Sequence, residues 1–255
     1  MIEKIPLQVS EFINLYFNLP LNGKKVTCPY YINIKIIRAR MALRVLIGKG
    51  SPEEIIQECL IYEKLRGVDF RKMSISEIRD FMVKRHIGID CSGFIVHILD
   101  YWLKSIQKKH LWKHLKFPKQ NLYMNISRLF RPIENISAYM LINKNNSSQI
   151  KNLNNIRTGD LIRLKGLKRG YHVMLISEID KSGGKVKSFK YIHATRWYTN
   201  EHGVREGRVI ITNTDLPLYK QKWTDILDGK NWTFEEILKD KNFSQIRRLK
   251  NVPLY

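Results

Sequence analysis

The spacing of hydrophobic residues changes once along this chain, and that change limits the fold more than any other feature of the sequence. Up to about residue 90, apolar residues recur at helical spacing; beyond about residue 155 they alternate with polar ones or form short unbroken runs. The later segments are predicted to be strands separated by glycine-containing turns: 160–165, 171–179, 188–195 and 208–213. Helices followed by a meandering antiparallel sheet and a short helical tail predict an α+β fold.

Several helix starts can be read directly from the sequence. A serine or threonine followed three residues later by glutamate is a capping box, in which the two residues satisfy each other's free backbone N–H groups. Three such boxes occur: Ser51 with Glu54, Ser74 with Glu77, and Thr233 with Glu236. A further helix is expected over 30–48, where Ile34, Ile37, Met41 and Val45 form the apolar face. Four basic residues interrupt this segment, so we interpret it as an amphipathic helix and not as a membrane span.

The charge of the chain is strongly unbalanced. Forty-five Lys and Arg stand against 23 Asp and Glu, a formal net charge of +22, yet 44% of the residues are hydrophobic, which excludes a disordered chain. Residues 101–159 alone carry eleven Lys and Arg and a single acidic residue, Glu134, interleaved with aromatic side chains. An excess of this size predicts attraction to polyanions. We expect the 101–159 surface to contact an anionic polymer or surface; the charge alone leaves nucleic acid, anionic lipid headgroups and an anionic cell-wall polymer open.

The three cysteines, Cys28, Cys59 and Cys91, do not form a disulfide framework and suit a reducing compartment. The N-terminus lacks a basic region followed by an apolar run and a cleavage site. We therefore expect no signal peptide and a cytoplasmic location, with release by a non-classical route as the open alternative. The histidines lack ligand-like spacing, so no metal site is expected. We expect no other cofactor, and the sequence does not indicate the oligomeric state.

The segment Gly-Ile-Asp-Cys-Ser-Gly-Phe, residues 88–94, is the sharpest local signal for chemistry. Cys91 lies where a loop enters a helix whose apolar face follows immediately. The helix dipole and the free N–H groups there favour a thiolate, and the Cys91 N–H is placed to stabilise an oxyanion. Ser92 and Gly93 are small enough to leave room for a substrate carbonyl. For Cys28 and Cys59, in contrast, a buried structural role is expected.

Two histidines lie on neighbouring predicted strands. His172 begins the apolar strand, and His193 lies within the next one. Adjacent strands are about 5 Å apart, so one ring can face the thiol while the second orients the first. His97, six residues after Cys91 in the same predicted helix, is interpreted as a packing residue.

Four segments in this order resemble the NlpC family of papain-like cysteine peptidases, which cleave peptide stems of bacterial cell walls. The segments are Gly-Ile-Asp-Cys-Ser-Gly-Phe (88–94), Arg-Thr-Gly-Asp-Leu (157–161), Tyr-His-Val-Met-Leu-Ile (171–176) and Tyr-Ile-His-Ala (191–194). The resemblance covers roughly residues 80–197. It implies a papain-like core, with helices packed on an antiparallel sheet and the nucleophile at a helix N-terminus. It also implies peptidase or amidase activity on a peptidoglycan stem peptide.

The resemblance implies a role for five residues. Cys91 is the nucleophile, His172 the general base and His193 the orienting group. Asp90 and Ser92 match residues that bind the free amino terminus of the stem in some members. The family usually also has a tyrosine near the oxyanion, some ten residues before the nucleophile. Residues 80–88 contain none, so His86 or a backbone group is the expected substitute.

The resemblance also suggests how the chain is organised. We expect a helical N-terminal region over 1–79 that packs on the core, and a catalytic domain over 80–255. The catalytic domain would carry a basic helical insertion at about 101–155 and a helical C-terminal tail.

Two alternatives remain open at this stage. The same Cys-His-His chemistry serves a deamidase, an acyltransferase or an effector toxin equally well. The net charge of +22 is also compatible with a nucleic-acid-binding protein on an inactive peptidase fold. We do not favour the latter, because the sequence contains no motif known to read RNA or DNA.

Overall fold

The computed structural model describes residues 1–32, 44–118, 130–165 and 170–254. Its α-helices are α1 (Leu7–Phe17), α2 (Pro52–Arg66), α3 (Ile75–Lys84), α4 (Cys91–Gln107), α6 (Ala138–Ile142) and α7 (Trp232–Lys239). Its strands are β1 (Ile2–Lys4), β2 (Leu19–Leu21), β3 (Lys24–Val26), β4 (Ser147–Ile150), β5 (Leu161–Lys165), β6 (Tyr171–Ser182), β7 (Lys185–Thr195), β8 (Gly203–Ile210), β9 (Lys222–Trp223) and β10 (Gln245–Leu249). Short 3₁₀ helices are η1 (Arg44–Ile47), η2 (Phe70–Lys72), η3 (Leu111–Lys113), η4 (Leu153–Asn155), η6 (Thr199–Glu201) and η7 (Leu218–Lys220).

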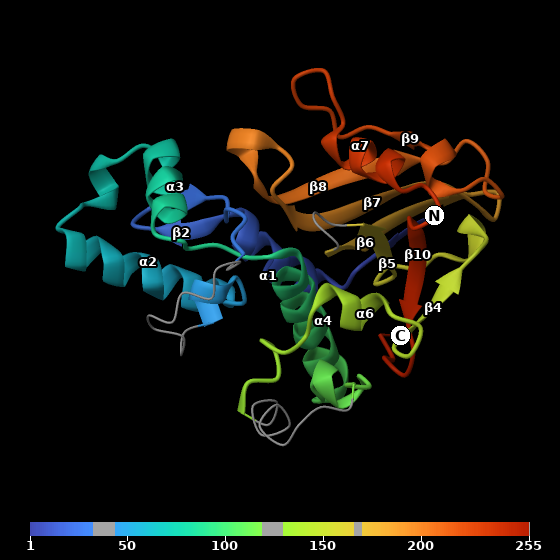
Figure 1. Cartoon of the computed structure of the whole chain (residues 1–255), viewed down its shortest axis with the longest axis horizontal. Coiled ribbons are helices and arrows are strands. Elements are labelled where there is room, and N and C mark those ends of the chain that lie inside the picture. Colours follow the sequence, from blue (N-terminus) through green and yellow to red (C-terminus); the bar gives the residue numbers. More distant parts are fainter. Residues whose placement is uncertain (33–43, 119–129, 166–169, 255) are drawn as a thin grey trace.

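One large antiparallel sheet forms the centre of the molecule (Figure 1). Its strand order is β4-β10-β5-β6-β7-β8-β9, and β1 pairs with the far part of β6. Strands β5, β6, β7 and β8 correspond to the four segments predicted from the period-2 pattern, although β8 begins five residues earlier than expected. The predicted α+β class, with helices on an antiparallel sheet, is therefore confirmed.

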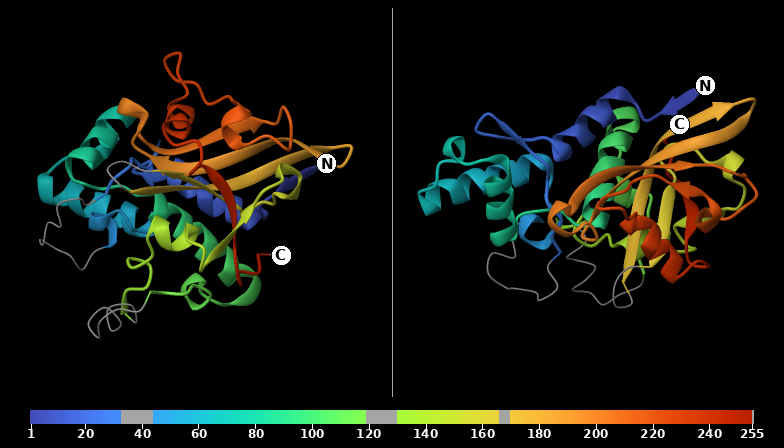
Figure 2. Two further views of the ribbon diagram at one scale, coloured as in Figure 1. Left: turned by 45° about the vertical axis from the view of Figure 1, so that its right-hand side comes forward. Right: turned by 90° about the horizontal axis from the view of Figure 1, so that it is seen from above.

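The sheet is covered on both faces, which explains the unbroken apolar run in β6. Val173 and Leu175 point into a cluster shared with α1 and α4. Met174 and Ile176 point into a second cluster that contains Ile237 of α7. Figure 2 shows α1 and α4 on one side of the sheet and α7 on the other. Because successive side chains of a strand alternate between faces, only a strand buried on both sides can be apolar at every position.

Two of the three predicted capping boxes are present. Ser51 accepts a hydrogen bond from the Glu54 N–H (3.3 Å) at the start of α2, and Ser74 caps α3 in the same way. The box predicted at Thr233 is wrong. Helix α7 begins at Trp232, and its N-cap is Asn231, whose side chain accepts from the Phe234 N–H (2.9 Å). Thr233 is buried inside the first turn.

The N-terminal region is less helical than its sequence pattern suggests. It contains α1, α2 and α3, but β1 joins the main sheet and β2 pairs with β3 in a small hairpin. Most of the helix predicted over 30–48 lies outside the described residues, and Val45 belongs to η1. Buried residues of α1, α2 and α3 lie in the same apolar cluster as those of α4, so the region packs on the rest of the chain through a common core.

Two expectations for the later part of the chain also need correction. The C-terminal tail is not purely helical, because β10 follows α7 and inserts between β4 and β5. The basic segment 101–155 is only partly helical. It includes the end of α4, then η3, α6 and β4, while 119–129 lie outside the described residues. Several of its apolar side chains are buried in the main core: Leu111, Leu115, Ile133, Ile136, Met140 and Leu141. This segment is thus part of the fold and does not simply project from it.

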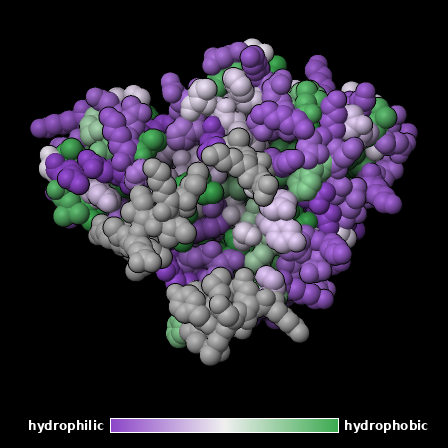
Figure 3. Space-filling view, in the orientation of Figure 1, coloured by the Kyte–Doolittle hydropathy of each residue, from purple (hydrophilic) through white to green (hydrophobic). Residues whose placement is uncertain are grey.

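The face of the molecule seen in Figure 3 is largely hydrophilic and is hollowed near its centre, close to where α4 begins in Figure 1. Among the described helices, none is long and apolar enough to cross a membrane.

Candidate active site

Cys91 is the first residue of α4, as the sequence predicts. Its neighbour Asp90 is the N-cap, and the Asp90 Oδ1 atom accepts the Gly93 N–H at 2.5 Å. The Asp90 N–H in turn donates to the carbonyl of Gly48 (2.9 Å). A Cβ atom on Gly93 would lie 2.5 Å from that same carbonyl oxygen, so only glycine allows residue 48 to approach so closely. These contacts fix the start of α4 and leave the Cys91 side chain 6% exposed.

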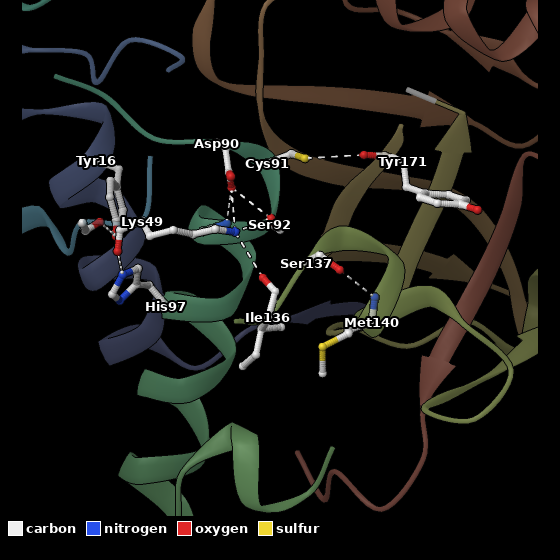
Figure 4. Close-up of polar contacts among 12 residues, drawn as sticks. Tyr16, Lys49, Asp90, Cys91, Ser92, His97, Ile136, Ser137, Met140 and Tyr171 are labelled. Carbon is white, nitrogen blue, oxygen red and sulfur yellow. Dashed lines mark hydrogen bonds and ion pairs between the residues drawn. The ribbon is translucent and has the colours of Figure 1, made fainter. Parts of the chain in front are cut away.

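The sulfur lies against the first residues of β6. Cys91 Sγ is 4.0 Å from the carbonyl oxygen of Tyr171, the residue before His172 (Figure 4). The backbone of Val173, the residue after His172, is close enough to lower the pKa of the thiol. The sulfur therefore lies against the strand backbone around His172. Local sequence places the thiol at a helix terminus, but only the packing of α4 on β6 brings it to this strand.

The two histidines form a directly bonded pair. His172 Nε2 and His193 Nδ1 are 2.9 Å apart, and both side chains are buried. The ring of Trp197 covers His172, with the ring centroids 4.3 Å apart. Since this bond uses Nε2 of His172, the Nδ1 atom of that ring remains for proton exchange with a thiol.

Proton exchange at that atom requires one particular arrangement of hydrogens. If Nδ1 of His172 is to accept a proton, Nε2 must donate to His193 Nδ1, and the proton of His193 must be on its Nε2. The His193 Nε2 atom is buried and has no hydrogen-bond partner among the described residues. His193 thus suits the orienting role, because its acceptor nitrogen faces His172.

Burial sets the protonation states of the resting site. Burial raises the pKa of the Cys91 thiol to about 12; the Asp90 carboxylate adds to this rise, while Lys49 opposes it. Burial likewise holds the pKa of His172 well below its usual value, and it lowers that of His193 to about 3 with help from Arg205. The resting groups are therefore a thiol and two neutral imidazoles. The helix N-terminus favours a thiolate, but desolvation of the sulfur outweighs the Lys49 charge and the backbone groups that lower its pKa.

A cavity of about 740 Å³ opens beside Cys91. Its wall is built from four parts of the chain: the N-terminal region, the start of α4, the segment before and within α6, and the strand ends that carry His172 and Trp197. The lining residues are Tyr30, Ile32, Lys49, Asp90, Cys91, Ser92, Glu134, Ile136, Ser137, Ala138, Tyr139, Gly170, Tyr171, His172, Thr195, Arg196 and Trp197. Four of the five predicted site residues lie on this wall, and His193 lies behind His172.

Asp90 and Ser92 face each other and a lysine that the sequence analysis did not single out. Lys49 Nζ donates to Asp90 Oδ1 (3.1 Å), to the Ile136 carbonyl (3.1 Å) and to Ser92 Oγ (Figure 4). The carbonyl of Lys49 accepts a hydrogen bond from His97 Nε2 (2.8 Å), so His97 holds this loop against α4. No local pattern could have revealed Lys49, which lies 41 residues before Asp90 in the chain.

Tyr30 is a second residue that the sequence analysis missed. A β-bridge joins it to Ile89, two residues before Cys91, and burial, together with the neighbouring Cys91 and Asp90, raises the pKa of its phenol. It brings a tyrosine into the cavity, whereas residues 80–88 supply none. His86, the substitute considered from sequence, is exposed and is not among the lining residues.

Within the described residues, no group of three or more His, Cys, Asp or Glu side chains is placed to hold a metal ion. All three cysteines are free thiols.

Comparison with known proteins gives one family. A family model described as "Putative amidase domain" matches residues 76–207, which is just over half of the chain and contains all five predicted site residues. The chain matches none of the curated proteins and none of the solved structures.

Proposed function

The chain belongs to the family described as "Putative amidase domain", and from that membership we propose that it hydrolyses an amide bond through Cys91, His172 and His193. One observation carries the proposal: Cys91, at a helix N-terminus, contacts β6, whose His172 is hydrogen-bonded to His193 of β7, and both Cys91 and His172 border one cavity. The family supports amide hydrolysis as the general function. The Cys-His-His chemistry and the substrate are our proposal.

The reaction begins from the neutral groups. Cys91 Sγ attacks the amide carbonyl carbon while Nδ1 of His172 accepts the thiol proton, so that no free thiolate is needed beforehand. The oxyanion receives hydrogen bonds from the Cys91 N–H and from the Tyr30 hydroxyl. His172 then passes the proton to the leaving nitrogen, and an amine departs from a thioester.

Hydrolysis of the thioester restores the site. His172 removes a proton from water, the resulting hydroxide attacks the thioester carbonyl, and the acid leaves as the Cys91 sulfur regains its proton from His172. His193 Nδ1 accepts the hydrogen bond from His172 Nε2 throughout and so keeps the His172 ring in place, as the third member of a catalytic triad does.

We propose a peptidoglycan stem peptide as the substrate, on the strength of the resemblance to NlpC peptidases. Five exposed lysines lie in the last turn of α4 or just after it: Lys104, Lys108, Lys109, Lys113 and Lys116. They support a location close to an anionic polymer. Among the described acidic residues, none forms an ion pair with these lysines.

The test is incubation of the purified chain with muropeptides, followed by chromatography and mass spectrometry, beside Cys91→Ala. We expect amide-cleavage products with the unaltered chain and a loss of at least about 1,000-fold in rate with the variant, because the nucleophile is removed. Cleavage that persists in the variant would overturn the role of Cys91. A Cys91-dependent reaction with a protein or small amide, but none with muropeptides, would replace the substrate and favour the deamidase or acyltransferase reading.

A further inference from the structure

A complete ammonium-binding site lies beside Cys91, and the chain fills it with its own lysine. The Lys49 side chain is only 8% exposed. Its three N–H donors meet three acceptors, namely the Asp90 carboxylate, the Ser92 hydroxyl and the Ile136 carbonyl. An ammonium group has three donors and no acceptor, so this set of partners is complete.

The main chain holds Lys49 in place independently of its side chain. Its N–H donates to the Arg44 carbonyl (2.9 Å), its carbonyl accepts from His97, and its backbone forms a β-bridge with Ile89. The side chain then extends from this fixed point across the start of α4 to the segment before α6. In Figure 4 its nitrogen ends beneath Asp90 and beside Ser92, and a dashed line joins it to Ile136.

The position of the Lys49 ammonium is electrostatically unfavourable, so a contribution to stability does not explain why a lysine lies there. A cation at a helix N-terminus opposes the helix dipole, and a buried ion pair contributes little net stability compared with apolar residues of the same size. The pair does act on the nucleophile, because Lys49 lowers the pKa of Cys91 while Asp90 raises it. Without Lys49, the carboxylate would stand uncompensated beside the thiol.

The pairing also determines which charges the cavity offers to a ligand. Its two acidic lining residues are Asp90 and Glu134. Asp90 is paired with Lys49, and Glu134 accepts from Arg131 Nε (3.0 Å). Among the described lining residues, both carboxylates are therefore already paired with a cation of the chain, each through one of its two oxygens.

We propose that Lys49 is a specificity-determining and positioning residue whose ammonium occupies the site where a substrate amino group would otherwise bind. The cleft then takes amides whose acyl side is neutral next to the cleaved bond, such as an N-acylated peptide, and rejects those with a free amino terminus there. The substrate preference rests on the proposed amidase function; the ammonium site itself does not.

The first experiment tests the site by chemical rescue. Lys49→Ala removes the atoms of n-propylammonium and leaves the three acceptors in place. We expect the rate of Cys91 alkylation by iodoacetamide at pH 7 to fall about tenfold, because the ammonium that lowers the pKa of the thiol is lost. Added n-propylammonium chloride is expected to restore at least half of that loss and to raise the melting temperature of the variant.

Three controls make this result specific. Sodium chloride at the same ionic strength and 1-propanol at the same concentration should rescue nothing. In the Lys4→Ala variant, which changes an exposed lysine paired with Glu178, iodoacetamide should alkylate Cys91 at the same rate as in the unaltered chain. Lys49→Ala combined with Asp90→Asn lacks the acceptor carboxylate and should not respond to the amine.

Folding does not limit the test. If Lys49→Ala is unfolded alone, the expected result is that it folds as n-propylammonium is added, because a ligand that binds only the folded state stabilises it. The absence of any amine-dependent gain in reactivity or stability would overturn the ammonium site, as would equal rescue by 1-propanol.

The second experiment tests the substrate class without a known substrate. Alanyl chloromethyl ketone and its N-acetyl form both alkylate a thiol with loss of chloride; in the second, a neutral acetamido group replaces the free amino group. We expect the unaltered chain to react at Cys91 at least tenfold faster with the N-acetyl form, and Lys49→Ala to lose or invert that preference. If the unaltered chain prefers the free amine, the specificity role is wrong, whatever the muropeptide result. If this preference holds but no amide is cleaved, the proposed amidase function is wrong and the ammonium site stands.

Discussion

At the scale of single residues, burial governs the chemistry of the candidate site. A cysteine at a helix N-terminus is usually regarded as a thiolate, but desolvation keeps Cys91 protonated and His172 neutral. General-base catalysis at the moment of attack therefore fits this site better than a preformed ion pair. Lys49 and Asp90 act as opposing charges that adjust the same thiol.

This protonation state can be measured directly. Because the thiol pKa is raised to about 12, the thiolate fraction should increase tenfold per pH unit across the neutral range. We expect the rate of Cys91 alkylation by iodoacetamide to rise with that slope from pH 6 to at least pH 9. Mass spectrometry of the labelled peptide separates Cys91 from Cys28 and Cys59, which are fully buried. A plateau in the rate below pH 8 would contradict the neutral resting state.

At the scale of elements, the start of α4 is the part on which the site depends most. The helix is held by its N-cap Asp90, by the Gly48 carbonyl and by the loop anchored through His97. Gly93 is essential to this arrangement, since residue 48 occupies the space that a side chain would need.

Gly93→Ala should therefore reverse the usual rule for helices. Alanine is favoured over glycine by about 1 kcal/mol in a helix interior. Here the added Cβ would meet the Gly48 carbonyl at 2.5 Å, and we expect a net loss of about 1–3 kcal/mol in the free energy of unfolding. Urea unfolding gives the value. Gln57→Ala, at an exposed position of α2, is the matched control and should change stability by less than about 0.5 kcal/mol. A stabilised Gly93→Ala variant would show that residue 48 can move away at little cost.

At the scale of the whole molecule, several neutral histidines are enclosed on folding. Burial lowers the pKa values of His97, His172 and His193 below 6.5. The unfolded chain therefore binds more protons than the folded chain once the pH falls below about 6.5, and stability must decrease with acid in that range.

The size of this acid sensitivity follows from proton counting. Each such histidine contributes up to about 1.4 kcal/mol per pH unit, so the three together give about 4 kcal/mol per pH unit between the unfolded and folded pKa values. We expect the urea midpoint to drop steeply from pH 6.5 to pH 5. His97→Asn should reduce the slope by about one proton, whereas His86→Asn, at an exposed position, should leave it unchanged. Stability that does not vary over this range would contradict the enclosure of neutral histidines.

Much of the fold could be predicted because its signals are local. The capping boxes of α2 and α3 and the alternation in β5 and β7 depend on residues within a few positions of one another. The start of α4 at Cys91 is also local. The capping box at Thr233 failed because Asn231, two residues earlier, offers an equally good cap and the helix begins there. Strand β10 was missed because its sequence, Gln-Ile-Arg-Arg-Leu, has two adjacent arginines that break the alternation, and its pairing with β4 and β5 forms only in the sheet.

The sequence by itself determined the α+β class, the helix start that presents Cys91, and the two strands that carry His172 and His193. Tertiary structure alone decided the rest: the bond between the two histidines, the enclosure that keeps the thiol protonated, and the arrival of Tyr30 and Lys49 beside it. The physical reason is range. Caps and hydrophobic periods act between near neighbours, whereas burial and ion pairing depend on segments that meet only when the chain has packed.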